Sequence, residues 1–208
     1  MILITYIIIA ITAITSVLAF NNRNLYERLL FSPGMISSHR QGYRFLTHAL
    51  VHGDWLHLLV NMFVLLSFGQ AVEMYFGMFF GNKGAYFFSL LYIGATALSS
   101  TPSFAKYKTD FNYRAVGASG AVSAVVFASI LIQPLSPIRF AFLPIDIPAF
   151  IFGALYLAYS AYMSRKGNDN IGHDAHFYGA VFGMVFTLIL KPVLFTGFID
   201  QVSNFFGA

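Results

Sequence analysis

The 208-residue sequence contains no cysteine, and only 10% of its residues are charged. The absence of cysteine excludes disulfides, thiolate nucleophiles and cysteine-ligated zinc. Soluble domains usually carry about 25% charged residues and are about half apolar, whereas 58% of this chain is hydrophobic. A soluble protein of this length could not bury so much apolar surface. We therefore expect a polytopic membrane protein.

The sequence also lacks the motifs of nucleic-acid-binding and nucleotide-binding proteins. The formal net charge of +4 is small and spread over the loops, so no basic stripe indicates nucleic acid. No glycine-rich phosphate loop, internal repeat or low-complexity tract is present. We expect one domain over residues 1–208, with no nucleic-acid partner and no cofactor.

Six apolar runs are long enough to cross a hydrocarbon core of roughly 30 Å, which takes about 20 helical residues. The runs are continuous, which favours helices over a barrel of short alternating segments. The first run has no Lys or Arg before it and is longer than the apolar stretch of a cleaved signal, so we expect a retained helix. The predicted fold is all-α, with spans at about 1–20, 55–76, 84–101, 115–133, 146–163 and 175–195.

The longest connection, residues 21–54, mixes apolar with polar residues throughout. This pattern is typical of short amphipathic helices in the membrane interface rather than of a solvated loop. If the N-terminus lies inside, most Lys and Arg residues fall in outer loops and the inner side keeps Lys83, Arg139 and Lys191. The positive-inside rule alone therefore places the N-terminus outside.

Polar clusters lie near the beginnings of the second, fourth and sixth runs. Even-numbered helices of a serpentine chain start from the same side of the bilayer, so connectivity brings these clusters to one leaflet. Polar side chains in membrane helices usually face a bundle interior or a water-filled cavity. The clusters supply His57, Asn61, Ser119 and His176.

Small residues recur every four positions beside two of these clusters. They are Gly120, Ala124 and Ala128 in the fourth run, and Ala175, Gly179 and Gly183 in the sixth. Small residues at this spacing let helix backbones approach closely in lipid. If the two stripes face each other, Ser119 and His176 come within hydrogen-bond range.

These residue types fit acyl transfer, which needs a nucleophile, a base and oxyanion donors. Ser119 is framed by glycines at a helix start, where backbone N–H groups lack helical partners. His176 is the natural base, and His57 and Asn61 can donate to developing negative charge. Asp174 is two positions from His176, on nearly the opposite helix face, and is better interpreted as a helix-start residue. The sequence therefore predicts a Ser-His dyad.

The motifs occur in order on the expected runs, and through them the chain resembles the rhomboid family of intramembrane serine proteases along nearly all of its length. The family's His-x4-His-x3-Asn, Gly-x-Ser-Gly and Ala-His-x-x-Gly patterns match, respectively, His52, His57 and Asn61; Gly117 to Gly120; and Ala175, His176 and Gly179. Tyr43-Arg44 is similar to a Trp-Arg motif of the first loop, and Glu73 falls where the family often has a glutamate.

The resemblance implies a six-helix bundle that cleaves single-span transmembrane proteins through an acyl-enzyme, without metal or cofactor. It implies an inside N-terminus, a site opening to the outer side, and a multi-pass protein of the bacterial inner membrane. Ser119 is then the nucleophile, His176 the base, and the Ser119 backbone, His57 and Asn61 the oxyanion donors. Supporting roles fall to His52, Gly117, Gly120, Gly179 and Arg44.

One departure from the family pattern stands beside the nucleophile. Many bacterial members have a tyrosine four residues after the serine, where it packs against the base, and this chain has Ser123. An alternative is therefore a catalytically silent rhomboid-like protein that binds transmembrane clients.

Three other interpretations of these residues do not involve proteolysis. His173 and His176, with His52 and His57, could ligate a metal or an axial haem position, and Asp54 is the one carboxylate at an obvious ligand spacing. His57 and Asn61 could be an interhelical hydrogen-bond pair. Arg44, Glu73 and Asp54 are more simply an anchor, an interhelical partner and a helix cap.

Overall fold

The computed structural model describes residues 4–140, 143–166 and 172–207. The first three residues of the predicted span 1–20 lie outside this part. The chain is mostly helical, as the sequence predicts. The longer helices are α1 (Ile4–Phe20), α5 (Trp55–Phe80), α6 (Gly84–Ser99), α8 (Ser119–Ile132), α9 (Ala149–Lys166), α10 (His173–Leu190) and α11 (Val193–Phe205). The shorter ones are α2 (Arg23–Leu29), α3 (Pro33–His39), α4 (Arg44–Thr47), α7 (Thr101–Tyr107) and the 3-10 turns η1 (His48–Leu50) and η2 (Gly81–Lys83).

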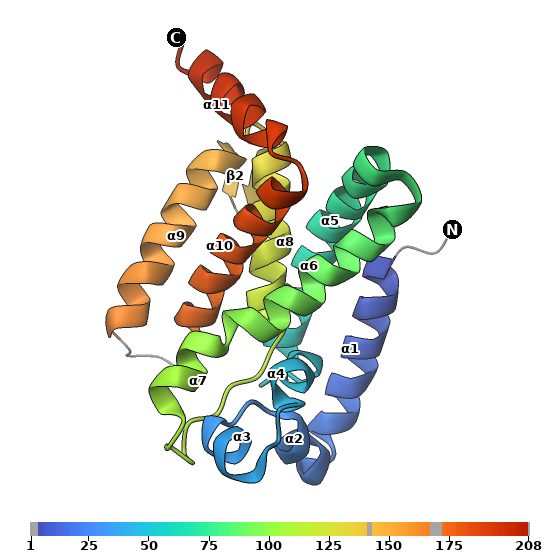
Figure 1. Ribbon diagram of the computed structural model, residues 1–208, viewed down its shortest axis with the longest axis vertical. Coiled ribbons are helices and arrows are strands. Elements are labelled where there is room, and N and C mark those ends of the chain that lie inside the picture. The colour runs from blue at the N-terminus through green and yellow to red at the C-terminus, as the bar shows by residue number, and fades with distance from the viewer. Residues whose placement is uncertain (1–3, 141–142, 167–171, 208) are drawn as a thin grey trace.

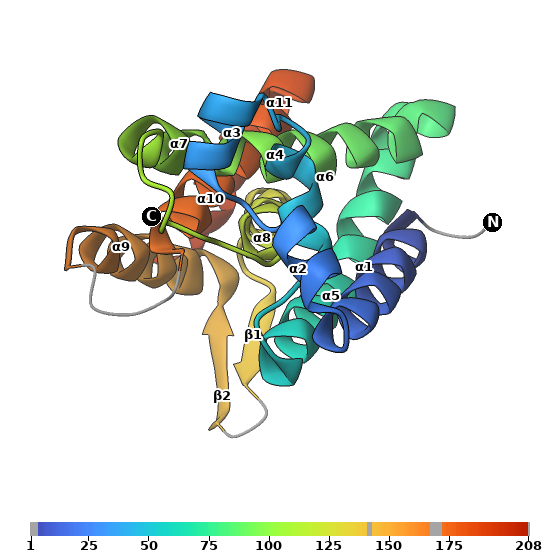
Figure 2. The same cartoon turned by 90° about the horizontal axis from the view of Figure 1, so that it is seen from below.

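Helix α8 lies at the centre of the bundle, surrounded by α1, α5, α6, α9 and α10 (Figures 1 and 2). Its residues from Gly120 to Ile132 are all buried except Ser129. A helix that is apolar on every side is stable only when it is enclosed on every side. Helix α8 packs against α5, α6, α9 and α10, and most extensively against α10.

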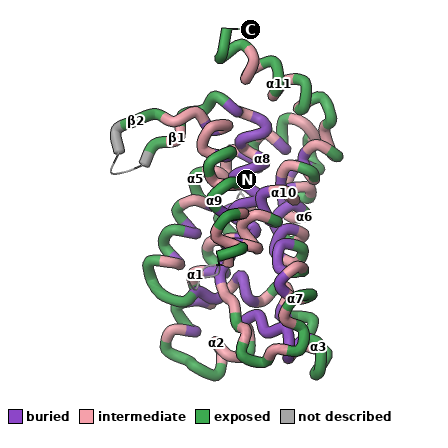
Figure 3. Tube along the Cα trace, turned by 90° about the vertical axis from the view of Figure 1, so that its left-hand side faces the viewer, coloured by how far each residue is buried: buried purple, intermediate pink, exposed green. Residues whose placement is uncertain are grey.

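The surrounding helices alternate between buried inner and exposed outer faces (Figure 3). Their outer faces carry large apolar side chains such as Ile14, Phe63 and Leu155. By length and composition, two described stretches could cross a membrane, namely Trp55–Tyr107 and His173–Leu190, while Ile4–Phe20 and Ser119–Ile132 are apolar but shorter. The six-crossing arrangement remains a prediction.

Helices α5, α8 and α10 all begin at the lower end of the bundle in Figure 1. The predicted parity of the second, fourth and sixth runs therefore holds. The short helices α2, α3 and α4, which occupy the predicted interfacial segment 21–54, lie at the same end.

Helix α8 starts at Ser119 rather than at the predicted residue 115, because the preceding segment is extended. Gly117 has φ +110°, which a right-handed helix does not allow. Ala115 instead pairs with Phe31, through backbone N···O distances of 2.9 and 3.1 Å. The loop between α2 and α3 thereby holds the strand-like approach to α8.

The predicted sixth span, 175–195, is also interrupted. Helix α10 ends at Leu190 and a separate helix α11 begins at Val193. Pro192, which lacks a backbone N–H, lies at the break. Helix α11 has no buried residue and extends away from the bundle (Figure 1).

A β-hairpin corrects both the all-α expectation and the start of the predicted span 146–163. Strands β1 (Pro137–Phe140) and β2 (Leu143–Pro148) pair in antiparallel fashion, with Ile138 opposite Ile147, and α9 begins only at Ala149. Arg139 and Asp146 form an ion pair across the hairpin, and this bond holds the pKa of the Asp146 carboxyl below its usual range. The hairpin projects to one side of the bundle (Figure 2).

The start of α1 is fixed by Glu73 of α5, which confirms the predicted interhelical partner. The Glu73 carboxylate accepts hydrogen bonds from the Ile4 and Thr5 backbone N–H groups at 2.7 and 3.0 Å, and from the Thr5 hydroxyl at 2.9 Å. A carboxylate at a helix N-terminus satisfies open N–H groups and favours the helix dipole. The hydrogen-bonding capacity of this buried carboxylate is thus satisfied by donors at the start of α1.

Candidate active site

The two small-residue stripes face each other, as predicted. A Cβ added to Gly179 of α10 would lie 2.8 Å from the carbonyl carbon of Gly120, and one added to Gly183 would lie 2.6 Å from the Cα of Ala124. Real Cβ atoms do not approach backbone so closely. Helices α8 and α10 are therefore in backbone contact immediately beside Ser119 and His176.

Ser119 is the first residue of α8, and its side chain is partly exposed. The N-cap residue is Ala118, and no side chain caps this helix start. The N–H groups of a first helical turn have no intrahelical acceptor. The Ser119 hydroxyl therefore stands beside backbone donors available to an anion.

The His57 imidazole packs against Gly117, two residues before the serine. A Cβ on Gly117 would meet His57 Cε1 at 2.6 Å and Nε2 at 2.7 Å. The Gly53 N–H makes a long, 3.5 Å hydrogen bond to His57 Nδ1. In the neutral imidazole this leaves the proton on Nε2, the atom that faces the serine loop.

His52 fixes the same loop from behind. The Ala118 N–H donates to His52 Nε2 at 3.3 Å, and His52 Nδ1 lies 2.9 Å from the Ser16 hydroxyl, which also donates to the Leu50 carbonyl at 2.9 Å. Since Nε2 accepts, Nδ1 carries the proton and donates to Ser16. Burial, with a smaller effect of nearby His57, lowers the pKa of His52 to about 3, which keeps the ring neutral. The supporting role expected for His52 is thus a link from α1 to the residue before Ser119.

Ser16 was missed by the sequence prediction. It lies with Thr5, Thr12 and Ala19 on the buried face of α1. Small and hydroxyl residues at that helical spacing mark an inward face, but nothing local identifies His52 as the partner.

Asn61 is buried one turn beyond His57. Its side-chain amide donates to the His57 carbonyl at 2.9 Å. A second amide hydrogen remains for another acceptor. The Asp54 carboxylate accepts from the His57 N–H at 2.8 Å, which confirms Asp54 as the cap of α5.

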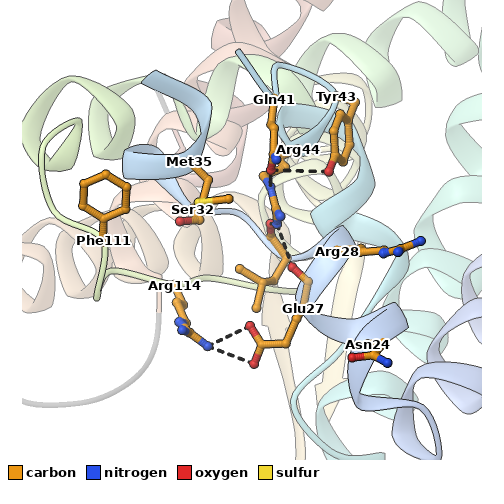
Figure 4. Close-up of a pocket in the computed structure, with 11 residues that line it drawn as sticks. Asn24, Glu27, Arg28, Ser32, Met35, Gln41, Tyr43, Arg44, Phe111 and Arg114 are labelled. Carbon is orange, nitrogen blue, oxygen red and sulfur yellow. Dashed lines mark hydrogen bonds and ion pairs between the residues drawn. The ribbon is translucent and has the colours of Figure 1, made fainter. Parts of the chain in front are cut away.

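Arg44 organises the segment between α2 and α4, in keeping with the predicted anchor. Its guanidinium is buried and donates to Gln41 Oε1 at 2.6 Å and to the carbonyls of Glu27 and Leu30 at 2.9 and 2.6 Å (Figure 4). A pocket of about 830 Å³ adjoins this network, and Arg114 pairs with Glu27 at its wall. Its lining includes Arg44 but neither Ser119 nor His176, so the pocket is distinct from the candidate dyad.

The aromatic ring that packs against His176 comes from α9 and not from the position four residues after Ser119, and the sequence did not predict it. Tyr156 of α9 stacks on His176, with ring centroids 6.1 Å apart and planes at 29°. Its hydroxyl lies 2.6 Å from that of Ser123. Tyr156 is one of many aromatics in apolar runs, and only the tertiary structure brings it to His176.

The other acidic and histidine residues near the dyad have structural contacts. Asp174 lies in the first turn of α10 and accepts a hydrogen bond from Ser164, which agrees with its interpretation as a helix-start residue. The His173 ring packs edge-on to those of Tyr159 and His176. Within residues 4–140, 143–166 and 172–207, no three His, Asp or Glu side chains gather as metal ligands would, so the metal alternative has no ligand set there.

Comparison with known proteins gives one consistent family. Residues 39–193 match the model of the Rhomboid domain. The chain is 28% identical over 169 residues to RHOMBOID-like protein 12, mitochondrial, of Arabidopsis thaliana, covering 77% of this chain and 50% of that protein. It is 28% identical over 163 residues to Rhomboid-like protein 11, chloroplastic, of the same organism, covering 72% and 52%.

The chain spans about half the length of these curated relatives. The printed names place them in a mitochondrion and a chloroplast. They therefore lend no support to the expected bacterial inner membrane.

Proposed function

The chain belongs to the rhomboid family, and from that premise we propose that it is an intramembrane serine endopeptidase with a Ser119–His176 dyad. Its substrates are single-span transmembrane proteins. The observation that carries the proposal is the backbone contact of Gly120 with Gly179, which brings the starts of α8 and α10 together. Two helix starts held this closely can share a proton between a hydroxyl and an imidazole.

In this proposal His176 takes the proton of Ser119 as Oγ attacks the scissile carbonyl carbon. The tetrahedral oxyanion accepts hydrogen bonds from the Ser119 N–H, His57 Nε2–H and the second amide hydrogen of Asn61. Collapse breaks the C–N bond, and the leaving amine takes its proton from His176. Water, deprotonated by His176, then hydrolyses the acyl-enzyme and restores Ser119.

The lengths of the helices support a recessed site that water can reach. Helix α8 has 14 residues, which at 1.5 Å per residue is about 21 Å, whereas the hydrocarbon core is roughly 30 Å thick. If α8 reaches one interface, its other end stops well short of the opposite one. Six crossings with an inside N-terminus would make Ser119 open to the outer side.

The alternative is a catalytically silent rhomboid-like protein that holds transmembrane clients. The feature in its favour is Ser123, which departs from the family's tyrosine. Against it stand both dyad residues and the aromatic support of His176 by Tyr156.

Covalent labelling by a fluorophosphonate in detergent separates the two functions. We expect wild-type protein to be labelled, Ser119→Ala and His176→Ala to lose labelling while staying folded, and Asn61→Ala to slow it by roughly 100- to 1000-fold. Co-expression with a panel of tagged single-span proteins then reports cleavage. Labelling of Ser119→Ala at the wild-type rate would refute the nucleophile, and a folded, unlabelled wild type would favour the silent protein.

A further inference from the structure

We propose that Tyr156 is the positioning residue for the His176 base, supplied by α9 in place of the tyrosine missing at position 123. The inference rests on the proposed dyad. Tyr156 lies outside all of the sequence motifs, and its proposed role is to orient the His176 ring for proton transfer.

The stack between the two rings is the first observation. A centroid separation of 6.1 Å and an interplanar angle of 29° lie within the range of favourable offset stacking. The face of the tyrosine restricts rotation of the imidazole about its side-chain bonds. A base must hold its acceptor nitrogen toward the serine, so this restriction bears directly on proton transfer.

The hydroxyl of Tyr156 ties the ring to the nucleophile's own helix. The Ser123 hydroxyl donates to the Ser119 carbonyl at 2.8 Å, so the 2.6 Å contact between the two hydroxyls is donated by Tyr156. The chain of bonds runs from Tyr156 through Ser123 to the backbone of Ser119. Ser123 is 3% exposed, which shields this chain from water.

Two phenylalanines also pack against the Tyr156 ring, which is half-buried. Phe127 of α8 lies 5.7 Å away and Phe152 of α9 5.8 Å away, centroid to centroid. The ring therefore has a fixed place even without its hydroxyl. Helices α8, α9 and α10 meet at this one side chain, so the orientation of His176 depends on α9.

This geometry also accounts for Ser123. A tyrosine at position 123 and Tyr156 would compete for the same face of His176. The small hydroxyl at position 123 leaves that space to α9 and anchors the ring that fills it. The aromatic ring that supports His176 thus comes from α9 instead of α8, and the Ser123 hydroxyl holds it.

The test compares variants of the full-length protein in detergent. Tyr156→Ala removes the ring, Tyr156→Phe keeps the ring but not the hydroxyl, and Ser123→Tyr with Tyr156→Ala transplants the ring to α8. Tyr162→Ala is the matched control, because Tyr162 lies on the same helix and is 61% exposed. Circular dichroism and size exclusion check folding. Tyr156→Leu, which keeps much of the volume without the ring, replaces Tyr156→Ala should the latter not fold.

Two readouts are needed. The first is the rate of fluorophosphonate labelling as a function of pH. We expect Tyr156→Ala to be slowed by about 10- to 100-fold with an altered pH profile, because a misplaced base costs rate in this range. Tyr162→Ala should stay near wild type. Tyr156→Phe should be slowed less than Tyr156→Ala, because it keeps the ring but loses the hydroxyl contact with Ser123, and the double variant should recover part of the rate.

The second readout does not require activity. In protein labelled with 13C-histidine, the His176 signal, identified by its loss in His176→Gln, should carry a ring-current shift. Tyr156→Ala should remove that shift and Tyr156→Phe should retain it. An unchanged His176 signal or an unchanged labelling profile in folded Tyr156→Ala would overturn the proposal. A wild type that is not labelled overturns the protease function instead, and the His176 signal still reports whether the stack exists.

Discussion

Replacing Gly179 by alanine tests whether contact between α8 and α10 sets the geometry of the proposed dyad. The added Cβ would lie 2.8 Å from the carbonyl carbon of Gly120, and the Gly120 oxygen is nearer still. A Cβ in ordinary van der Waals contact lies 3.4 Å or more from its neighbours. The obstacle is backbone, which cannot rotate away as a side chain can. The helices must therefore separate by at least about 0.6 Å, and by more than about 1 Å once the oxygen is included.

Moving α8 and α10 apart by that amount increases the distance between Ser119 and His176, the two proposed reacting groups. A misplacement of about 1 Å costs on the order of 100-fold in rate, which corresponds to about 2.7 kcal/mol of barrier. Overpacking also destabilises a core by about 1–3 kcal/mol. We expect Gly179→Ala to fold in detergent and to be labelled by a fluorophosphonate about 100-fold more slowly than wild type.

Two further variants separate geometry from stability. Gly183→Ala meets the backbone of Ala124 one turn further from His176, so it should lower stability comparably but slow labelling less. Gly197→Ala, on α11, meets nothing within 4 Å and should change neither quantity. Labelling of folded Gly179→Ala at the wild-type rate would refute the argument that this contact positions the dyad.

Three other predictions concern the frame around the site. Glu73→Gln weakens the cap of α1 and should lower the free energy of unfolding by about 1–2 kcal/mol, measured by denaturation in mixed detergent; an unchanged value contradicts the capping role. Burial lowers the pKa of His48 from 6.5 to about 4. The free energy of unfolding should therefore be constant above about pH 6.5 as far as His48 is concerned, and should fall by about 3 kcal/mol as the pH is lowered to 4. Thermal unfolding between pH 7 and 4 checks this, and His48→Gln should flatten the slope. Gly117→Ala places a Cβ 2.6 Å from the His57 ring at φ +110° and should slow labelling by about 100-fold or more, whereas Gly53→Ala, whose Cβ lies 3.8 Å from that ring, should not.

Local sequence patterns predicted the features that a single helix determines, namely its start, its cap and the residues on one of its faces. Continuous apolar runs located α5 and α6 at their starts, and four-residue spacing identified the Gly179 and Gly183 stripe. The acidic residue before an apolar run marked Asp54 as a cap, which the structure bears out. These features follow from helical periodicity and from open N–H groups at a helix start.

Features that depend on pairing between distant residues were not predictable in this way. Prolines such as Pro137 and Pro148 are typical of a break between helices, but strand pairing across that break depends on the register of Ile138 with Ile147. Ser16 and Tyr156 gain their roles from partners 36 and 20 positions away, and nothing in the composition around them distinguishes them from other hydroxyl or aromatic residues. The sequence predicted the residues of the candidate site but not the distant contacts that hold them in place.

Through its pairing with Phe31, Ala115 holds the segment before Ser119 by backbone hydrogen bonds to a part of the chain that is distant in sequence. Gly117 donates to the His48 carbonyl at 2.9 Å, which adds a second fastening. The mostly exposed turn at 109–112 joins α7 to this stretch, and the backbone bonds to Phe31 and His48 hold the stretch independently of that join. We therefore expect two polypeptides, 1–110 and 111–208, to assemble into the same fold when they are co-expressed. Reconstituted labelling after co-expression of the halves would show it, and inert halves that do associate would show that the covalent join itself matters.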